Sequence, residues 1–486
     1  MDRLKNALPI VASAVLFCLA FPPFNLGLLV FVALVPWLVS LAQPGARGFR
    51  SGYLFGWIIV LEQMAFVQTI TVRWTGSVAL SFAPWIVCAG IGALYFGALG
   101  AILQRALARG WFWAIPLAWA GLEVCRSFIP GLAFPYFLVA TPLWAYPMLI
   151  QTAYLGTIYF VGAWVVLINM LFVFYLLRTP FMVVRKYAIV ASLLMMATLF
   201  RFVQPLEGKQ RVIVAGQPGV NMAYGDAAER YRKLGDAVAD IYRESKSHKT
   251  DLIVLPEGLA EGGTGLPPPT AFVVEPGVPI LFGGRRIQDG LTYQSAYAFD
   301  GKWQMADKAR LVVFGEYVPG RKFLPFLDAF KLPQGDLSPA AKTSAVNVGG
   351  LRVGPMICFE SLFWDVAYHQ VQNDAQLLAV MSIDDWYMGT WAPDQLRTGA
   401  VFRAVECDLP VVRAGALGYT MSVDQRGRVV HEAKLGETTA LASGLMIPEH
   451  ATPMPVRPLF PWAFGLSLPG LALALLWPRK RVPAEK

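Results

Sequence analysis

The sequence predicts a polytopic α-helical membrane domain joined to a layered α/β domain. The chain of 486 residues is 56% hydrophobic and only 15% charged, whereas soluble globular proteins carry roughly 25% charged residues. Long apolar stretches fill residues 1–204 and recur near the C-terminus, while residues 205–448 alternate short apolar runs with helical patterns. We therefore expect a membrane domain at 1–204, an α/β domain at 205–448, and a last membrane helix with a basic tail at 449–486.

The apolar stretches predict about eight membrane spans. A helix needs roughly 20 apolar residues to cross the hydrocarbon core of a bilayer. Stretches of about this length and character lie at 8–23, 25–42, 52–72, 79–103, 111–129, 154–177, 187–204 and 459–477.

The basic residues predict the orientation of these spans, because short cytoplasmic loops carry an excess of Lys and Arg. One side of an eight-span frame holds Arg3, Lys5, Arg47, Arg50, Arg105, Arg109, Arg178, Arg185, Lys186, Arg479, Lys480, Arg481 and Lys486. The short loops of the other side hold only Arg73 and Arg126. Both termini should therefore be cytoplasmic, with the α/β domain on the far side. This placement of charge also argues against a nucleic-acid partner, despite the net charge of +9.

Two features inside the predicted spans or at their boundaries stand out. Glu62 lies in "VLEQMAF", and Glu123 and Arg126 lie three residues apart in "LEVCRS". Residues at this spacing share a helix face and can pair. Ionisable residues inside a membrane often mark a functional site, although a position at the membrane surface would explain them equally well.

The α/β domain is indicated by short apolar runs, which are typical of buried strands. These runs are "RVIVAGQ", "DLIVLPE", "VPILFGG", "SAYAFD", "RVGPMICFE", "AQLLAVMS" and "LPVVRAG". Helical patterns at 227–245 and 394–407 lie between them. Strands mixed with helices predict a layered α/β architecture.

Three chemically capable residues stand at or after these runs. Glu257 closes "DLIVLPE", Lys308 lies in "MADKARLVVFGEYVP", and Cys358 closes "VGPMICFE". A thiol must lose its proton to attack a carbonyl, a carboxylate can accept that proton, and an ammonium group can stabilise the resulting oxyanion. The five cysteines and four histidines show no metal-ligand spacing, so we expect no metal site.

Four segments together resemble the carbon-nitrogen hydrolase (nitrilase) superfamily: "LPE", "DKARLVVFGEYVP", "ICFES" and "SIDDWY". With the eight-span frame, the chain resembles the membrane-bound apolipoprotein N-acyltransferase family, including "WAGLEVCRSFIPGLAFPYF" and "FRAVECDLPVVRA". The resemblance implies an αββα sandwich at 205–448. The roles it implies are general base for Glu257, oxyanion-stabilising cation for Lys308, nucleophile for Cys358, supporting acids for Glu316 and Glu360, and a substrate-binding aromatic pair for Trp386 and Tyr387.

The family resemblance also implies the reaction. A fatty acyl chain passes from a phospholipid to Cys358 as a thioester, and then to the α-amine of a lipoprotein's diacylglyceryl-cysteine. Each half is an acyl transfer at one site, so the kinetics should be ping-pong. No cofactor is implied. The implied location is the bacterial inner membrane, with a periplasmic catalytic domain.

Several positions depart from the family pattern. Ile383 stands where an asparagine is usual, Asp385 where a small residue is usual, and "RAGALGY" at 413–419 lacks the usual asparagines. Phe359 and Tyr136 are further departures, in "ICFES" and "AFPY". Two alternatives therefore stay open: a membrane-tethered amidase or acyltransferase with another acceptor, and a non-catalytic relative that binds lipid or lipoprotein.

The α/β domain has only two cysteines, Cys358 and Cys407. Exported cysteines tend to form disulfides, so a retained thiol needs a reason. We expect Cys358 to be a thiolate of lowered pKa beside Lys308, covered by an apolar lid at 314–330. We expect Cys407 to be a core residue.

Overall fold

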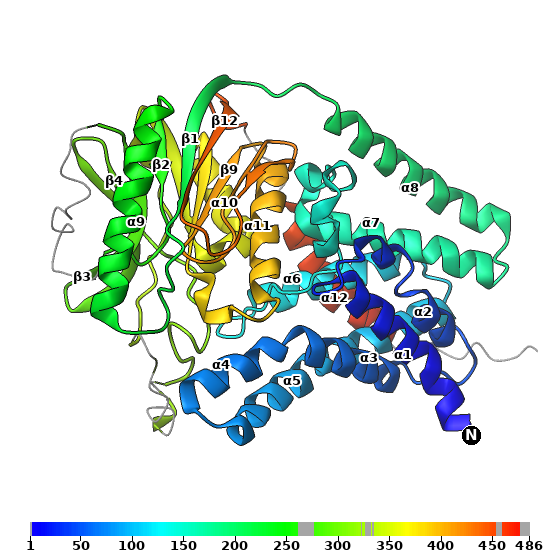
Figure 1. The fold of residues 1–486 in the computed structure, drawn as a ribbon. Coiled ribbons are helices and arrows are strands. Elements are labelled where there is room, and N and C mark those ends of the chain that lie inside the picture. The colour runs from blue at the N-terminus through cyan, green and yellow to red at the C-terminus, as the bar shows by residue number, and fades with distance from the viewer. Residues whose placement is uncertain are drawn as a thin grey trace, which may run out of the picture.

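The computed structural model describes residues 2–260, 277–321, 323–325, 332, 335–452 and 459–476. A group of apolar helices packs beside an α/β domain (Figure 1). The predicted basic tail from Arg479 to Lys486 and part of the predicted lid lie outside the described residues.

Apolar helices occur in each of the eight predicted stretches. Their bounds are α1 Asp2–Ala20, α2 Val35–Leu41, α3 Gly48–Gln63, α4 Ala65–Thr75, α5 Val78–Ala108, α6 Ala114–Phe128, α7 Ala153–Leu176, α8 Phe181–Phe202 and α12 Leu459–Leu476. Short 3-10 helices are η1 Gly27–Phe31, η2 Thr141–Ala145 and η3 Pro147–Leu149.

Among the described helices, α5, α7 and α8 are individually long and apolar enough to cross a membrane. Helices α3 and α4 reach that length as a pair, bent by 48°. Helices α1 and α12 and the η1–α2 segment are apolar but shorter. The count of eight spans and their orientation therefore stay predictions.

Helices α3 and α5 pack closely because α3 carries Gly48, Gly52 and Gly56 on one face. A Cβ at Gly52 would lie 2.1 Å from the carbonyl oxygen of Phe96 on α5, which no other residue could accommodate. Small residues at every fourth position let two helix backbones approach in this way.

The α/β domain contains two six-stranded sheets. The first has the order β12-β1-β2-β3-β4-β5, and the second has the order β11-β10-β9-β8-β7-β6. The strands of the first sheet are β1 Lys209–Gln217, β2 Leu252–Val254, β3 Ile280–Gln288, β4 Leu291–Phe299, β5 Trp303–Asp307 and β12 Thr439–Ile447. Those of the second are β6 Val346–Val348, β7 Leu351–Ile357, β8 Leu377–Ser382, β9 Val411–Gly415, β10 Met421–Val423 and β11 Val429–Glu432.

Helices cover the outer faces of both sheets, which makes an αββα sandwich (Figure 1). Helix α9 (Ala227–Ser247) packs on the first sheet, whereas α10 (Trp364–Gln372) and α11 (Ala392–Cys407) pack on the second. An apolar core lies between the sheets. The expected nitrilase-like α/β architecture is confirmed, and every apolar run quoted above contributes to a strand.

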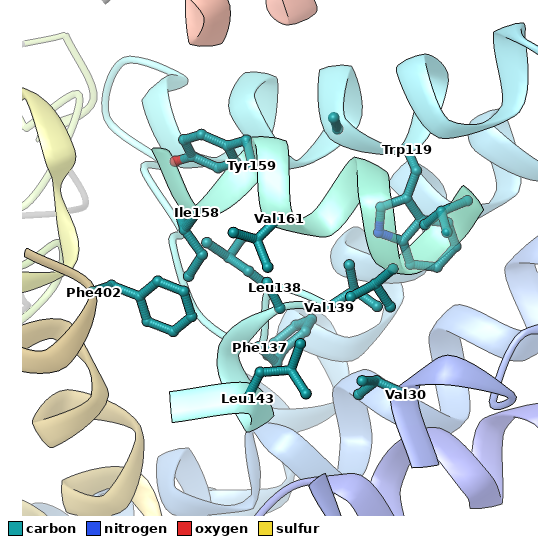
Figure 2. Close-up of a cluster of buried hydrophobic side chains, with 14 of the residues drawn as sticks. Val30, Trp119, Phe137, Leu138, Val139, Leu143, Ile158, Tyr159, Val161 and Phe402 are labelled. Carbon is teal, nitrogen blue, oxygen red and sulfur yellow. The ribbon is translucent and has the colours of Figure 1, made fainter. Parts of the chain in front are cut away.

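Helix α11 is the main contact between the α/β domain and the apolar helices. Its Gln395 donates a hydrogen bond of 2.9 Å to Gln63 at the end of α3. Its Glu406 accepts one of 2.8 Å from the backbone N–H of Ile158 on α7. Figure 2 shows Phe402 of α11 facing Ile158 and the segment that contains Leu138. Helix α11 thus joins the α/β domain to α3 and α7 through buried hydrogen bonds.

Candidate active site

The ends of parallel strands bring the predicted residues together. Strand β2 leads to Glu257 and β7 to Cys358, while β8 leads into the loop that carries Trp386 and Tyr387. Strands β7 and β8 are parallel, with Ile357 opposite Met381. The carboxyl ends of such strands are the usual ligand sites of α/β folds.

Cys358 occupies a sharp turn directly after β7. Its φ is +52°, in the left-handed region that few non-glycine residues adopt. The short helix η5, Cys358–Leu362, begins at this residue, and the Ser361 hydroxyl donates a hydrogen bond of 2.8 Å to its carbonyl oxygen. Backbone conformations of this kind persist where surrounding structure holds them, often at functional sites.

Lys308 lies between two carboxylates. Its Nζ is 2.6 Å from Oε1 of Glu316 and 4.0 Å from Oε1 of Glu257. Lys308 and Glu257 are both buried, at 1% and 6% exposure. Strand β3 passes directly behind Glu257, and a Cβ at Gly283 would lie 2.7 Å from the Cα of Glu257. Glycine at 283 therefore allows the sheet to hold the carboxylate at this depth.

Burial and charge set the protonation of the three groups. Burial raises the pKa of Glu257 to about 7, against the opposing effect of Lys308. Although burial alone would lower it, the carboxylates of Glu316 and Glu257 raise the pKa of Lys308 above its ordinary value. Glu257 is therefore a carboxylate near and above neutral pH, and Lys308 stays a cation.

The prediction that Cys358 is a thiolate of lowered pKa is wrong for the resting site. Burial and the nearby Glu257 raise the pKa of Cys358 to about 12, and the opposing effect of Lys308 is too small to compensate. The thiol is thus protonated at rest, and a base must remove its proton for the sulfur to attack. Cys407 is buried in α11, as expected of a core residue.

Glu360 ties the cysteine turn to the lysine loop. Its Oε2 accepts a hydrogen bond from the backbone N–H of Ile357 at 2.8 Å. Its Oε1 accepts bonds from the N–H groups of Ala309 at 2.7 Å and Arg310 at 3.0 Å. One buried carboxylate therefore fixes the backbones that precede Cys358 and follow Lys308.

Residues of the apolar helices complete the surroundings of Cys358. The ring of Tyr136, from the segment between α6 and α7, lies 5.8 Å from Phe359 and 5.8 Å from Phe66 of α4. Phe66 lies 5.7 Å from Tyr387, and the hydroxyl groups of Tyr136 and Tyr387 are hydrogen-bonded. Both tyrosines lie within the electrostatic reach of Cys358.

The loop that carries Trp386 is also held by α4. The guanidinium of Arg73 donates to the carbonyl oxygen of Trp386 at 3.0 Å and to that of Met388. The same group lies 5.3 Å from the ring centre of Tyr224, which itself contacts Trp386. The loop after β8 is thus fixed against α4 by Arg73, with Tyr224 packed on Trp386.

Two of the departures from the family pattern are coupled in space. The carboxylate of Asp385 accepts hydrogen bonds from the backbone N–H groups of Met222 and Leu417, so it ties "RAGALGY" to the loop after β8. Ile383 contacts Glu257 through its backbone N–H, which any residue supplies, while its side chain packs over Gly258.

Sequence reasoning missed a polar chain behind the nucleophile. Ser382 lies within the electrostatic reach of Cys358 and donates a hydrogen bond of 2.6 Å to Asp384. Asp384 also pairs with Arg413 at 2.7 Å, and all three residues are fully buried. An arginine inside the apolar run "LPVVRAG" was the available signal, because a buried cation needs a buried anion.

Glu123 and Arg126 hold the segment that presents Tyr136. No direct salt bridge joins their side chains, although both are described and buried. Glu123 instead accepts the N–H of Val139 at 2.7 Å, and Arg126 donates to the carbonyl oxygens of Phe134 and Phe137. The predicted side-chain pair is therefore replaced by two contacts with one backbone segment. Glu62 accepts a hydrogen bond from its neighbour Gln63.

The contacts of Glu316 predict a selective defect in Glu316→Gln. Its Oε1 neutralises Lys308 and its Oε2 accepts the N–H of Val312 at 2.8 Å, so the variant keeps the fold but loosens the lysine. We expect an acylated enzyme to form, with release to an amine acceptor slowed about 10- to 100-fold, because the family resemblance implies that Glu316 also supports the incoming amine. Single-turnover kinetics would separate the two steps. Asp336→Asn, at a more exposed acid paired with Arg321, is the control and should leave both steps unchanged. A loss of acylation equal to the loss of release would contradict this role.

Two segments of the chain match known protein families. Residues 13–171 match the apolipoprotein N-acyltransferase N-terminal domain, and residues 275–445 match the carbon-nitrogen hydrolase family. The second match contains Lys308 and Cys358, while Glu257 precedes it. Among the described residues, no group of three or more His, Cys, Asp or Glu side chains is arranged to hold a metal ion.

Named relatives cover most of the chain. An apolipoprotein N-acyltransferase of Geobacter metallireducens is 28% identical, over 87% of this chain and 86% of its own. One from Rhizobium meliloti is 28% identical over 86% of each. A solved structure, Saccharomyces cerevisiae Nit3 of the nitrilase superfamily, is 18% identical and covers 57% of this chain and 99% of its own, with a TM-score of 0.38.

The two-sheet sandwich and the match over residues 275–445 make the α/β domain similar to the carbon-nitrogen hydrolases. Over nearly its whole length the chain is similar to the apolipoprotein N-acyltransferases, whose N-terminal domain matches residues 13–171.

Proposed function

We propose that this protein transfers a fatty acyl chain from a phospholipid to the α-amine of a lipoprotein's N-terminal diacylglyceryl-cysteine. The observation that carries the proposal is the buried Glu257–Lys308 pair beside a cysteine in a strained turn. Lipoprotein N-acylation is the activity named for the relatives. Acylation through a Cys358 thioester is the mechanism that this geometry supports best.

In the first half-reaction, Glu257 takes the thiol proton as the sulfur attacks the ester carbonyl. The ammonium of Lys308 stabilises the oxyanion of the tetrahedral intermediate. The ester C–O bond then breaks, and the departing lysophospholipid oxygen receives the proton from Glu257. The products are a thioester on Cys358 and a lysophospholipid.

In the second half-reaction, the lipoprotein amine attacks the thioester carbonyl. Glu257 takes a proton from the amine, Lys308 again stabilises the oxyanion, and the C–S bond breaks. The sulfur leaves and recovers its proton, which gives an amide and the free enzyme. Both substrates carry long acyl chains, so apolar helices beside the site would let them approach without leaving the bilayer.

A product assay tests this proposal. The purified protein would be incubated with phosphatidylethanolamine and a synthetic diacylated lipopeptide, and the lipopeptide analysed by mass spectrometry. We expect a third acyl chain, in amide linkage, on the N-terminal cysteine. Release of free fatty acid with no gain in lipopeptide mass would instead favour an amidase- or hydrolase-type activity.

The orientation of the basic residues predicts opposite reporter signals from two positions. Alkaline phosphatase fused after residue 230 should be active, because that part of α9 is expected on the periplasmic side. The same fusion at the C-terminus should be inactive and a fluorescent protein there should fold, since the final basic residues are expected in the cytoplasm. A cytoplasmic signal from residue 230 would contradict both the topology and the lipoprotein substrate.

A further inference from the structure

Arg310 is an exposed cation two residues after Lys308. Its guanidinium lies 5.6 Å from the ring centre of Phe128 and 5.5 Å from that of Phe363. Asp365 accepts a hydrogen bond from its Nη2. The side chain is nevertheless 40% exposed, whereas that of Lys308 is fully buried. Two rings and one carboxylate thus orient the group and leave its other N–H donors without a described protein partner.

Aromatic residues surround this cation where α6 ends and α12 begins. Trp462, in the first turn of α12, lies 5.5 Å from Phe128 and 6.2 Å from Trp364. Trp462 is 49% exposed. Aromatic side chains are enriched at the headgroup level of membranes, where their rings bridge lipid and water. The position of this cluster at the ends of two apolar helices fits that level.

Arg310 is held at a fixed place relative to the nucleophile. Its backbone N–H donates to Glu360, the same carboxylate that holds the N–H of Ile357. Two residues of extended chain cover at most about 7 Å, so the Cα of Arg310 lies within that distance of the Cα of Lys308. In a glycerophospholipid, three glycerol carbons and their oxygens separate the phosphate from the first ester carbonyl, which is a spacing of the same order.

We propose that Arg310 binds the phosphate of the acyl-donor phospholipid and so places the ester carbonyl between Cys358 and Lys308. This inference rests on the proposed function, because it assumes a phospholipid donor at this site. Arginine suits the task, since its planar group can donate two parallel hydrogen bonds to a phosphate. One edge of the Arg310 guanidinium is occupied by Asp365, and the solvent-facing edge is available for the phosphate.

Kinetics in mixed micelles test the proposal with two acyl donors. Phosphatidylethanolamine carries the phosphate, and p-nitrophenyl palmitate is an acyl ester without one. Thioester formation on Cys358 would be followed by mass spectrometry over a range of donor concentrations. In Arg310→Gln, we expect the KM for phosphatidylethanolamine, relative to that for p-nitrophenyl palmitate, to rise at least about tenfold. Arg310→Lys keeps the charge but loses the two parallel donors of the guanidinium. Its KM ratio should therefore lie between those of the wild-type protein and Arg310→Gln.

Asp365→Asn separates phosphate binding from a purely structural ion pair. If Arg310 served only to pair with Asp365, the asparagine variant would show the same defect as Arg310→Gln. Because asparagine keeps an oxygen that can accept from Arg310, phosphate binding predicts that Asp365→Asn raises the KM ratio of the two donors much less than Arg310→Gln does. Arg243→Gln, at an exposed arginine of α9 paired with Asp240, controls for the loss of a surface charge.

Three results would overturn the assignment: an unchanged KM ratio in Arg310→Gln, an equal loss with both donors, or the same defect in Asp365→Asn. Failure of the proposed function looks different, because the wild-type protein would then form no thioester with either donor. Melting temperatures of the variants, measured in the same detergent, would identify any that fail to fold. If Arg310→Gln fails to fold, the KM ratios of Arg310→Lys and Asp365→Asn still test whether Arg310 binds the phosphate.

Discussion

Glu257→Gln should reduce the rate of thioester formation by about 10²- to 10⁴-fold, the usual contribution of a general base. The glutamine keeps the size of the side chain and its hydrogen-bond acceptor but cannot take a proton. The loss should be large because burial raises the pKa of Cys358 to about 12. Very little thiolate exists near neutral pH without a base, since each pH unit below the pKa reduces the ionised fraction about tenfold.

The pH dependence gives a second readout of the same role. Burial raises the pKa of Glu257 to about 7, and the base acts only when ionised. Thioester formation in the wild-type protein should therefore rise with pH, reach half its maximum near pH 7, and level off above it. Raising the pH to 9 should not rescue Glu257→Gln, because the thiol itself is still protonated there.

Glu257→Asp is the matched control, since it retains a carboxylate but moves it away from the sulfur. We expect reduced activity that still levels off above neutral pH, whereas the small residual activity of the glutamine variant should keep rising through pH 9 as thiolate forms. Both variants should be assayed by intact-protein mass after incubation with phospholipid and no acceptor. Acyl-enzyme formed by Glu257→Gln at the wild-type rate would show that another group is the base.

The strands around the site could be predicted because their apolar character is local. The segments "DLIVLPE" and "RVGPMICFE" are buried strands that end in polar residues. Strands that pair in parallel bring such ends to the same edge of a sheet. The strands that were missed are short or lie at edges. Strand β11, Val429–Glu432, has mostly exposed side chains, so no apolar pattern marks it.

The electrostatics of the site could not be predicted, because they depend on depth. Sequence shows that a lysine and a cysteine occur, and the expectation of a thiolate followed from their pairing alone. In the fold, Lys308 is already neutralised by Glu316 and Glu257, and Cys358 is buried beside a carboxylate. The thiol of Cys358 is therefore neutral at rest, and Glu257 must remove its proton before the sulfur can attack.

The pairing of Glu123 with Arg126 failed for a different reason. Their spacing is right for a helix-face pair, but the backbone of residues 134–139 lies against that face and offers carbonyl and N–H groups instead. Contacts between segments that are not adjacent in the sequence leave no local pattern from which they could be predicted. The same is true of Tyr136, whose place beside Phe359 depends on this segment.

Cys358→Ser should fold normally and form no thioester from phospholipid. Serine is similar in size and tolerates the turn, so the hydrogen bond from Ser361 and the packing of η5 should be kept. Its hydroxyl ionises far less readily than a thiol, so serine is a much poorer nucleophile than cysteine in the same site. We therefore expect the acyl mass increment to disappear from the intact protein.

Cys407→Ser is the matched control, because it makes the same substitution at the other cysteine of the α/β domain. Cys407 is buried in α11, on the far side of β9 from the sandwich core, so we expect a serine there to lower the melting temperature without affecting the acyl group. This variant should gain one fatty acyl chain, and neutral hydroxylamine should remove it, as expected for a thioester. If the increment survives in Cys358→Ser in hydroxylamine-sensitive form, or is lost in Cys407→Ser, the nucleophile is not Cys358.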